Sequence, residues 1–254
     1  MACPRATAPW WAQAMIVARR DGPILRIAFD RPTARNAIDA AGWDDLARKI
    51  DLAGRSDAAA VVLTSDVTGI FSAGADLSML GTLHHEPDER PRFRQRMAGA
   101  VEGLAALPMP VIAAVDGACY GAAVALVLAA DIVIAGDAAS FAVTPAKLGI
   151  GYPAADVARL TTRIGRGQAS RMLFTAAPVA AEEALRIGLA DVGASSADAA
   201  AADVAQTIAG NASSAVHLLK RTILRPNDGD AGFDAAFGGQ EFADRLTAFR
   251  NRAR

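Results

Sequence analysis

Residues 111–135 have the sequence VIAAVDGACYGAAVALVLAADIVIA, and this stretch decides the fold class. It begins and ends with short apolar runs, Val111–Val115 and Ile132–Ala135, which predict strands. Ala122–Ala130 lies between them and is apolar on every side, so it predicts a helix that is buried all round. A strand, a buried helix and a second strand in this order are typical of a parallel βαβ unit.

Strand-like and helix-like segments alternate through the first 150 residues. The expected elements are two strands within residues 15–30, a helix within 36–52, a strand at 59–64, small residues passing into a helix over 71–80, a polar surface loop at 84–91 and a helix at 93–107. From Ala154 onward the pattern is helical nearly to the end, with breaks at glycine and proline. The sequence therefore predicts an α/β core followed by a helical C-terminal region.

Composition and charge exclude several classes of function. The chain has 254 residues, a net charge of -1 and two cysteines, Cys3 and Cys119. We therefore expect no nucleic-acid partner, no disulfide framework and a reducing, cytoplasmic location. The histidines and cysteines show no metal-ligand spacing, so we expect no metal site. The longest strongly apolar run, Ala122–Ala130, has nine residues, which is too short to span a membrane. Residues 1–14 lack a secretory h-region and are expected to form a flexible extension, with Met15 as an alternative start.

Two stretches of small residues each follow an apolar run and precede a helical pattern. They are FSAGADL at residues 71–77 and DGACYGAA at residues 116–123. Small side chains allow a ligand to approach the backbone, and the first N–H groups of a helix are free to bind it. Two such N–H groups pointing at one place would stabilise an oxyanion. The alternative interpretation is that the small residues only permit tight packing of strand on helix.

The ordered set of these and other motifs resembles the enoyl-CoA hydratase/isomerase (crotonase) superfamily. The matching pieces are DRP at 30–32, RNA at 35–37, FSAGADL at 71–77, LPMPVIAAVDG at 107–117, ADIVIA at 130–135, Phe141, KLGI at 147–150, FTA at 174–176 and ALRIGLA at 184–190. Together they cover roughly residues 16 to 225 of the chain.

The resemblance implies a fold, an assembly and a ligand. It implies a spiral of ββα units over residues 15–192, and a helical trimerisation region over 193–254 that forms a homotrimer or a dimer of trimers. It implies an acyl-CoA thioester as substrate, with coenzyme A as part of that substrate and no permanently bound cofactor. The thioester carbonyl would lie between the backbone N–H groups of Ala75 and Ala122. The CoA thioester pocket would be formed by Arg35, Ala37, Ala73, Asp76, Leu77, Gly121 and Pro145.

The acid–base residues of a hydratase in this superfamily are missing. Such an enzyme uses two glutamates, and their positions align with Ala125 and Pro145. The chain has no glutamate between Glu102 and Glu182, so a small shift of the alignment would not restore the pair. Because neither alanine nor proline can transfer a proton, we do not expect standard hydration of an enoyl-CoA.

Tyr152 is the remaining candidate for proton chemistry. The residues TPAKLGIGY at 144–152 resemble the methylmalonyl-CoA decarboxylase branch, in which a tyrosine at this position works beside a histidine. The histidine position aligns with Ala75, so half of that pattern is absent. Tyr152 would supply a proton or hold a carboxylate; the alternative is that it packs with its hydroxyl on the backbone. Asp156 has the same two interpretations, a catalytic group or a carboxylate at a helix N-terminus.

Three further residues have two interpretations each. Cys119 is expected to be a small buried apolar residue rather than a nucleophile. Asp66 lies either on a surface loop or at the mouth of the pocket. Lys220 either approaches CoA phosphates from a neighbouring subunit or is a solvated helical lysine.

Three functions therefore stay open for the chain. The first is an enzyme that stabilises the enolate of an acyl-CoA, possible reactions including decarboxylation. The second is an acyl-CoA binding protein without catalysis. The third is a conventional hydratase that recruits an acid from elsewhere in the chain.

Overall fold

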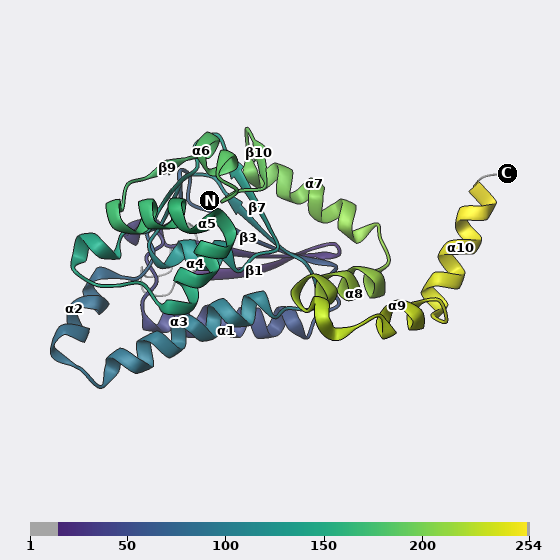
Figure 1. Ribbon diagram of the computed structural model, residues 1–254, viewed down its shortest axis with the longest axis horizontal. Helices are drawn as coiled ribbons and strands as arrows, with labels where there is room; N and C mark the ends of the chain where they lie inside the picture. The colour runs from purple at the N-terminus through teal and green to yellow at the C-terminus, as the bar shows by residue number, and fades with distance from the viewer. Residues whose placement is uncertain (1–14, 253–254) are drawn as a thin grey trace, which may run out of the picture.

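A computed structural model describes residues 15–252 of the chain, which form two β-sheets covered by helices (Figure 1). The strands are β1 (Ile16–Asp21), β2 (Ile24–Phe29), β3 (Ala60–Ser65), β4 (Ile70–Ser72), β5 (Val111–Val115), β6 (Ala118–Tyr120), β7 (Ile132–Gly136), β8 (Ser140–Ala142), β9 (Val179–Ala180) and β10 (Val192–Ala194). The helices are α1 (Ala40–Gly54), α2 (Leu77–His85), α3 (Glu89–Ala105), α4 (Ala122–Leu128), α5 (Ala154–Thr175), α6 (Ala181–Arg186), α7 (Ala197–Ala209), α8 (Ser213–Leu224), α9 (Ala231–Ala236) and α10 (Gln240–Arg252).

Consecutive strand pairs contribute one strand to each sheet. The larger sheet has the order β1-β2-β3-β5-β7-β10, and the smaller has the order β4-β6-β8-β9. Each of the pairs β3–β4, β5–β6 and β7–β8 therefore crosses from the larger sheet to the smaller one before the chain returns through helices. β1 pairs antiparallel with β2, whereas the strands from β2 to β10 in the larger sheet pair in parallel. This arrangement confirms the predicted α/β class and the spiral of ββα units.

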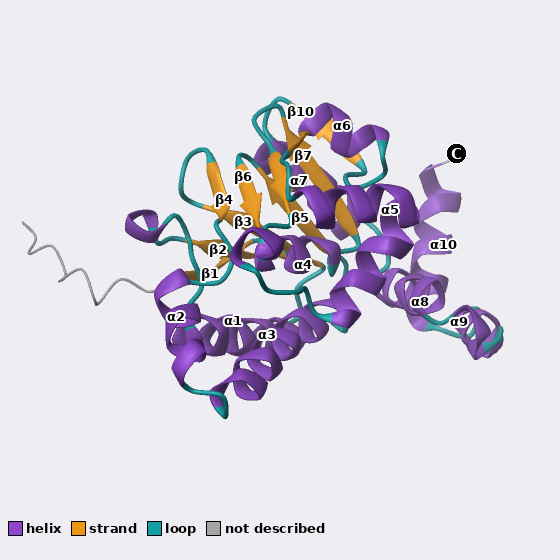
Figure 2. Cartoon of the chain, turned by 60° about the vertical axis from the view of Figure 1, so that its left-hand side comes forward, coloured by secondary structure: helices purple, strands orange, loops and turns teal. Residues whose placement is uncertain are grey.

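The two faces of the larger sheet meet different partners. Along β3, Val61 and Leu63 join the main core, whereas Ala60 and Val62 face α7, because side chains alternate along a strand. On α7, Ala197, Ala201 and Ala205 recur every four residues and are fully buried against this face. α4 is buried at every position, as its all-apolar sequence predicted, and α1 and α3 run side by side below the sheets (Figure 2).

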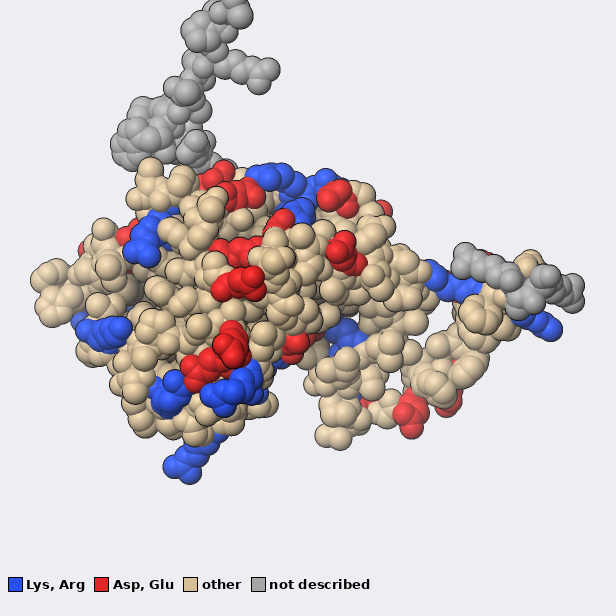
Figure 3. Space-filling view, turned by 90° about the horizontal axis from the view of Figure 1, so that it is seen from above, with Lys and Arg blue, Asp and Glu red and all other residues tan. Residues whose placement is uncertain are grey.

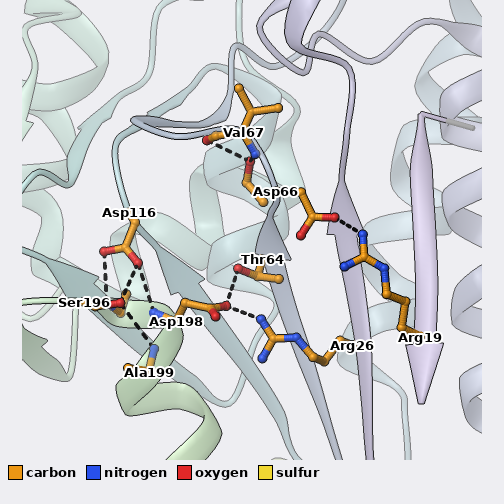
Figure 4. Close-up of polar contacts among 11 residues, drawn as sticks. Arg19, Arg26, Thr64, Asp66, Val67, Asp116, Ser196, Asp198 and Ala199 are labelled. Atoms are coloured by element: carbon orange, nitrogen blue, oxygen red, sulfur yellow. Dashed lines mark hydrogen bonds and ion pairs between the residues drawn. The ribbon is translucent and has the colours of Figure 1, made fainter. Parts of the chain in front are cut away.

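Polar side chains fix α7 on the sheet (Figure 4). Asp116, just after β5, accepts hydrogen bonds from Ala197 N at 2.9 Å and Asp198 N at 3.0 Å. Asp198 in turn accepts from Thr64 Oγ1 at 2.9 Å and pairs with Arg26. Carboxylates at a helix N-terminus satisfy N–H groups that have no partner within the helix. Residues that follow β5 are thereby linked to an element about eighty positions later in the chain.

Several elements differ from the sequence-based expectations. The predicted loop at 84–91 is shorter, because α2 continues to His85 and α3 starts at Glu89. Pro91 lies in the first turn of α3, where a missing N–H costs no hydrogen bond. β9 and β10 occupy breaks in a region expected to be helical, and each adds to a sheet edge. The break predicted at Gly165 is a bend inside α5, where this residue has φ 75° and ψ 157°.

Helices α8–α10 extend away from the layered body (Figures 1 and 2). Lys220 on α8 is buried, and its Nζ donates to Asp131 Oδ2 at 2.7 Å and to Met109 O at 3.0 Å. The interpretation of Lys220 as a solvated lysine was therefore wrong, since its ammonium group joins α8 to the core within one chain. Its approach to CoA phosphates of a neighbouring subunit stays a prediction. Helices α8–α10 form a C-terminal arm, residues 213–252, which exposes large apolar side chains: Leu219, Ile223, Leu224, Phe233, Phe237, Phe242, Leu246 and Phe249.

The surface of the described residues has mixed charge. Figure 3 shows acidic and basic side chains interspersed on one face, with the arm standing out from the body. None of the helices between residues 15 and 252 combines the length and apolar character that a bilayer-spanning segment needs. The predicted flexible extension, residues 1–14, and Cys3 lie outside the described residues.

Candidate functional site

A cavity of about 760 Å³ opens between the two small-residue stretches and helix α3. Its lining is mostly apolar, with three basic side chains and two tyrosines. The lining residues are Ala34, Arg35, Ala37, Ala73, Ala75, Asp76, Leu77, Leu80, Phe93, Arg94, Met97, Tyr120, Gly121, Ala122, Thr144, Pro145, Lys147, Leu148, Ile150, Gly151, Tyr152 and Pro153. The structure therefore brings all the predicted pocket residues to one cavity, while their binding of CoA stays a prediction.

The first bend, residues 73–76, joins β4 to α2. Ile38 N donates to Gly74 O at 2.7 Å, and Asp76 N donates to Ile38 O at 3.0 Å. In an extended segment, successive residues direct their backbone groups to opposite sides. Because the groups on either side of Ala75 face Ile38, the N–H of Ala75 points away from Ile38.

Asn36 and Ser72 hold the first bend through buried hydrogen bonds. Asn36 is fully buried, and its Nδ2 donates to Phe71 O at 2.9 Å and to Ser65 Oγ at 2.8 Å. Ser72 Oγ donates to Asn36 O at 2.7 Å and accepts from Gly74 N at 3.1 Å. Asn36 has φ 55°, a conformation that asparagine tolerates better than most residues. A polar network therefore fixes this bend.

The second bend, residues 121–122, joins β6 to α4. Gly121 has φ 57° and ψ −124°, and its N donates to Ala142 O at 2.8 Å. Ala122 is the first residue of α4, so its N–H has no acceptor within the helix. The buried apolar helix α4 fixes the position of this bend from the other side.

The two bends meet backbone to backbone. A β-carbon at Gly74 would stand 2.5 Å from Tyr120 O and 2.8 Å from Ala122 N, so only glycine fits there. Among the hydrogen bonds formed within residues 15–252, neither Ala75 N nor Ala122 N has a protein acceptor. Ala75 and Ala122 thus both line the cavity and carry N–H groups without a protein acceptor, while the convergence of these two donors on one oxygen stays a prediction.

Comparisons with known proteins show the family of the chain. The model of the family described as enoyl-CoA hydratase/isomerase matches residues 19–236. The chain belongs to the enoyl-CoA hydratase/isomerase family. It is 31% identical over 246 residues to a short-chain-enoyl-CoA hydratase from Clostridium acetobutylicum, covering 92% of this chain and 94% of the relative.

Solved structures support the same family. An enoyl-CoA hydratase/carnithine racemase from Magnetospirillum magneticum superposes with a TM-score of 0.88 at 26% identity, covering 95% of this chain and 94% of the other. An enoyl-CoA hydratase from Bacillus anthracis superposes with a TM-score of 0.86 at 25% identity, covering 94% and 97%. The predicted membership of the crotonase superfamily is thereby confirmed.

Ala125 and Pro145, to which the sequence-based prediction assigns the two glutamate positions, have no ionisable side chain. Ala125 is fully buried in α4, and Pro145 lines the cavity at the start of a 3-10 turn, Pro145–Leu148. Within the described residues, Asp76 is the one carboxylate in the lining. Its Oδ1 caps α2 by accepting from Ser78 N at 2.9 Å, and its Oδ2 lies 3.2 Å from Arg31. This carboxylate is therefore engaged in structural contacts.

Tyr152 enters this family member's cavity and bonds the backbone. Its hydroxyl donates to Gly121 O at 3.0 Å, which is the contact that the packing interpretation predicted. Burial, and then the negative charge of Asp156, raise the pKa of the Tyr152 hydroxyl well above its ordinary value. The group therefore stays protonated, and its predicted role as a proton donor requires it to leave the Gly121 carbonyl.

Three other candidates lie outside the lining of the cavity. Asp156 is buried in the first turn of α5 and pairs with Arg159 at 3.2 Å; burial raises its pKa, while Arg159 opposes that rise. Cys119 is fully buried, which raises the pKa of its thiol and favours the neutral form, consistent with the apolar interpretation. Asp66 pairs with Arg19 on the surface, as Figure 4 shows, so the pocket-mouth alternative was wrong.

Sequence reasoning missed one wall of the cavity. Phe93, Arg94 and Met97 contribute from α3, and Thr144 contributes a hydroxyl beside the second bend. Thr144 Oγ1 would lie 3.4 Å from a β-carbon at Gly121. The pattern predicted α3 as an amphipathic helix, but no local signal indicated which of its turns would face the bends.

Proposed function

We propose that this protein binds an acyl-CoA thioester with its carbonyl oxygen between Ala75 N–H and Ala122 N–H. The observation that carries this proposal is the pair of unpartnered N–H groups at one largely apolar cavity. Two donors aimed at one oxygen stabilise the negative charge that grows on it when the thioester becomes an enolate. The family's relatives, which include an enoyl-CoA hydratase, support a CoA thioester as the ligand class.

The cavity offers suitable partners for the rest of such a ligand. Arg35, Arg94 and Lys147 contribute cationic groups to the lining, and phosphates bind such groups through charge-assisted hydrogen bonds. Phe93 and Met97 offer apolar surface for the acyl or pantetheine part. In this proposal coenzyme A is part of the substrate and not a resident cofactor.

We propose decarboxylation rather than hydration as the reaction. Hydration needs positioned groups to move protons to and from water and the α-carbon, and Ala125 and Pro145 supply none. In a malonyl-type thioester, the bond from the α-carbon to the carboxylate breaks, CO2 leaves, and its electron pair forms the enolate. The two N–H groups stabilise that enolate, and a proton from water then completes the α-carbon.

A second function is favoured by a specific observation. The one carboxylate in the described lining caps α2, and the Tyr152 hydroxyl is bonded to the backbone. If water does not protonate the enolate, a protein whose Asp76 and Tyr152 are both engaged in this way would bind acyl-CoA thioesters without converting them. This alternative shares the cavity and the N–H pair with the main proposal.

The exposed apolar arm supports a further part of the proposal, which is assembly. We propose that residues 193–254 contribute to a homotrimer or a dimer of trimers. Phe233 and Phe249 are 61% and 75% exposed on α9 and α10, and exposed apolar side chains of this size are typical of interfaces.

Turnover and binding with a panel of thioesters test the function. Malonyl-CoA and methylmalonyl-CoA are assayed for release of CO2, crotonyl-CoA for hydration, and all three, with free CoA, for binding by calorimetry. We expect CO2 release and little hydration. Rapid hydration of crotonyl-CoA would overturn the proposed reaction. Tight binding of thioesters without any conversion would support the binding protein, and failure to bind any thioester would refute both.

A further inference from the structure

Tyr152 contacts the second bend through a single hydroxyl group. Its Oη donates to Gly121 O at 3.0 Å, and the same carbonyl accepts from Val124 N at 3.1 Å. The Tyr152 side chain packs against the main hydrophobic core, and this packing restricts the position of its hydroxyl. Because burial raises the pKa of Tyr152, its hydroxyl remains a donor at neutral pH and above.

The bonded carbonyl and the proposed oxyanion donor belong to one peptide unit. Gly121 C=O and Ala122 N–H share a planar trans peptide, in which the two groups point to opposite sides. Any group that fixes the direction of the carbonyl therefore fixes the direction of the N–H. Tyr152 acts on the side of this peptide opposite to the Ala122 N–H.

This peptide has an alternative orientation. Gly121 has φ 57° and ψ −124°, and a half-turn of the peptide would bring ψ to about +56°, at the centre of the left-handed region that glycine adopts freely. The same half-turn would move the φ of Ala122 from its negative helical value to a positive one, which alanine resists. Gly121 permits the flip, whereas three features oppose it: the φ of Ala122, the Val124 N–H bond to Gly121 O and the Tyr152 hydrogen bond to the same carbonyl.

We propose that Tyr152 is a positioning residue, whose hydroxyl holds the Gly121–Ala122 peptide with the Ala122 N–H directed into the cavity. This inference rests on the proposed function, because it gives Tyr152 a role only if Ala122 N–H binds the thioester carbonyl. It differs from proton donation, since the hydroxyl proton stays on Tyr152 throughout. The residue therefore supports the enolate through the backbone.

The test uses butyryl-CoA labelled with ¹³C at its thioester carbonyl, a saturated probe. Its infrared carbonyl band is recorded free and bound to the full-length protein, and affinity for free CoA is measured alongside. For the wild type we expect a bound band at lower frequency. Tyr152→Phe should lose a clear part of this shift while its affinity for free CoA stays unchanged. Turnover of the substrate found in the panel should fall about tenfold with KM little changed.

A matched control and a second variant separate positioning from general damage. Tyr120→Phe removes the hydroxyl of the other tyrosine among the lining residues; within residues 15–252 this hydroxyl lies 3.3 Å from Ser140 Oγ and forms no hydrogen bond to Gly121 or Ala122. It should keep the wild-type carbonyl shift. Ala122→Gly removes the alanine's resistance to the flip; alone it should keep most of the shift, and combined with Tyr152→Phe it should lose more than the two single losses predict.

The outcomes are distinct. A full wild-type shift in Tyr152→Phe would overturn the positioning role and leave the proposed function intact. Equal losses in Tyr120→Phe and Tyr152→Phe, or a large loss in Ala122→Gly alone, would also overturn it. If the wild type binds butyryl-CoA without any carbonyl shift, the proposed function itself fails. Melting temperatures of all variants show whether each one folds.

Discussion

The two bends at the cavity present the same backbone group but are held by different physical means. The first bend, around Gly74 and Ala75, is fixed by the buried hydrogen bonds of Asn36 and Ser72. The second, at Gly121 and Ala122, is fixed by the packing of an apolar helix and by one tyrosine hydroxyl. Two similar stretches of small residues are therefore held by different interactions, one by buried hydrogen bonds and the other mainly by helix packing.

This difference has consequences for tolerance to mutation. A polar network loses stability sharply when one buried partner is removed, because the other groups remain desolvated and unpaired. A packed helix loses stability when its volume changes, but its main-chain direction depends on the few hydrogen bonds at its end. The predictions below separate the bends on this basis, from the largest expected effect to the smallest.

Removing the N–H of the second bend should have the largest effect. Ala122→Pro replaces this donor at the first position of α4, where proline suits a helix. If the N–H binds the carbonyl, turnover should fall by about 10²–10³ and the carbonyl shift of bound butyryl-CoA should disappear. Ala40→Pro at the first position of α1 is the control and should keep both. Equal activity in the two variants would show that Ala122 N–H has no role.

Adding a methyl group at the first bend should disrupt the contact between the bends. Gly74→Ala places a β-carbon 2.5 Å from Tyr120 O at φ 87°, so we expect a loss of about 2–3 kcal/mol in the free energy of unfolding. Gly22→Ala also has positive φ but meets no atom within 4 Å, and it should lose only about 1 kcal/mol. Chemical denaturation measures both. Similar losses would mean that the bends do not touch.

Removing the amide at the first bend should cost about as much stability as a buried unpaired group. Asn36→Ala removes the two buried Nδ2 hydrogen bonds to Phe71 O and Ser65 Oγ, so we expect a loss of about 2 kcal/mol in the free energy of unfolding. Asn211→Ala removes one exposed hydrogen bond from the side-chain amide to Thr207 O, and it should change the free energy of unfolding by less than about 0.5 kcal/mol. A loss for Asn36→Ala no larger than the control would contradict the polar network.

A pH-dependent effect at Asp156 should be the smallest. Burial raises the pKa of Asp156 from its ordinary value of 3.8, so ionising it costs more in the folded than in the unfolded protein. The folded protein does not bear this free-energy cost at a pH below the ordinary pKa of Asp156. It bears the full cost once the pH has risen above the raised pKa. Asp156→Asn should therefore gain stability at neutral pH, while Arg159 keeps its 2.8 Å contact with Glu102. The gain should shrink towards pH 4.

Denaturation curves between pH 4 and pH 7 measure this difference. Asp203→Asn, which neutralises an exposed carboxylate on α7, controls for the change in net charge. If the gain of Asp156→Asn is the same at every pH, or grows as pH falls, the raised pKa does not contribute to stability.

The local sequence pattern predicted most of the strands and helices, but it did not predict which residues of α3 line the cavity. Periodicity and β-branched runs placed β2, β3, β5 and β7, because each of these segments is buried by its own apolar sequence. The exposed or short edges, such as β9 and β10, gave no such signal, since two or three residues have no measurable period. The shortened loop before α3 was missed because proline is tolerated in a first helical turn.

The sequence by itself determined the elements, the small residues at both bends, the family and the absence of carboxylates at the positions of Ala125 and Pro145. These depend on residue type and order, which no packing can change. Tertiary structure decided that Gly74 meets Ala122, that Tyr152 bonds Gly121 and that Lys220 is buried against Asp131. Each of these contacts joins residues that are 31 to 89 positions apart in the chain. It forms only when the folded sheets bring those residues within hydrogen-bond or van der Waals distance.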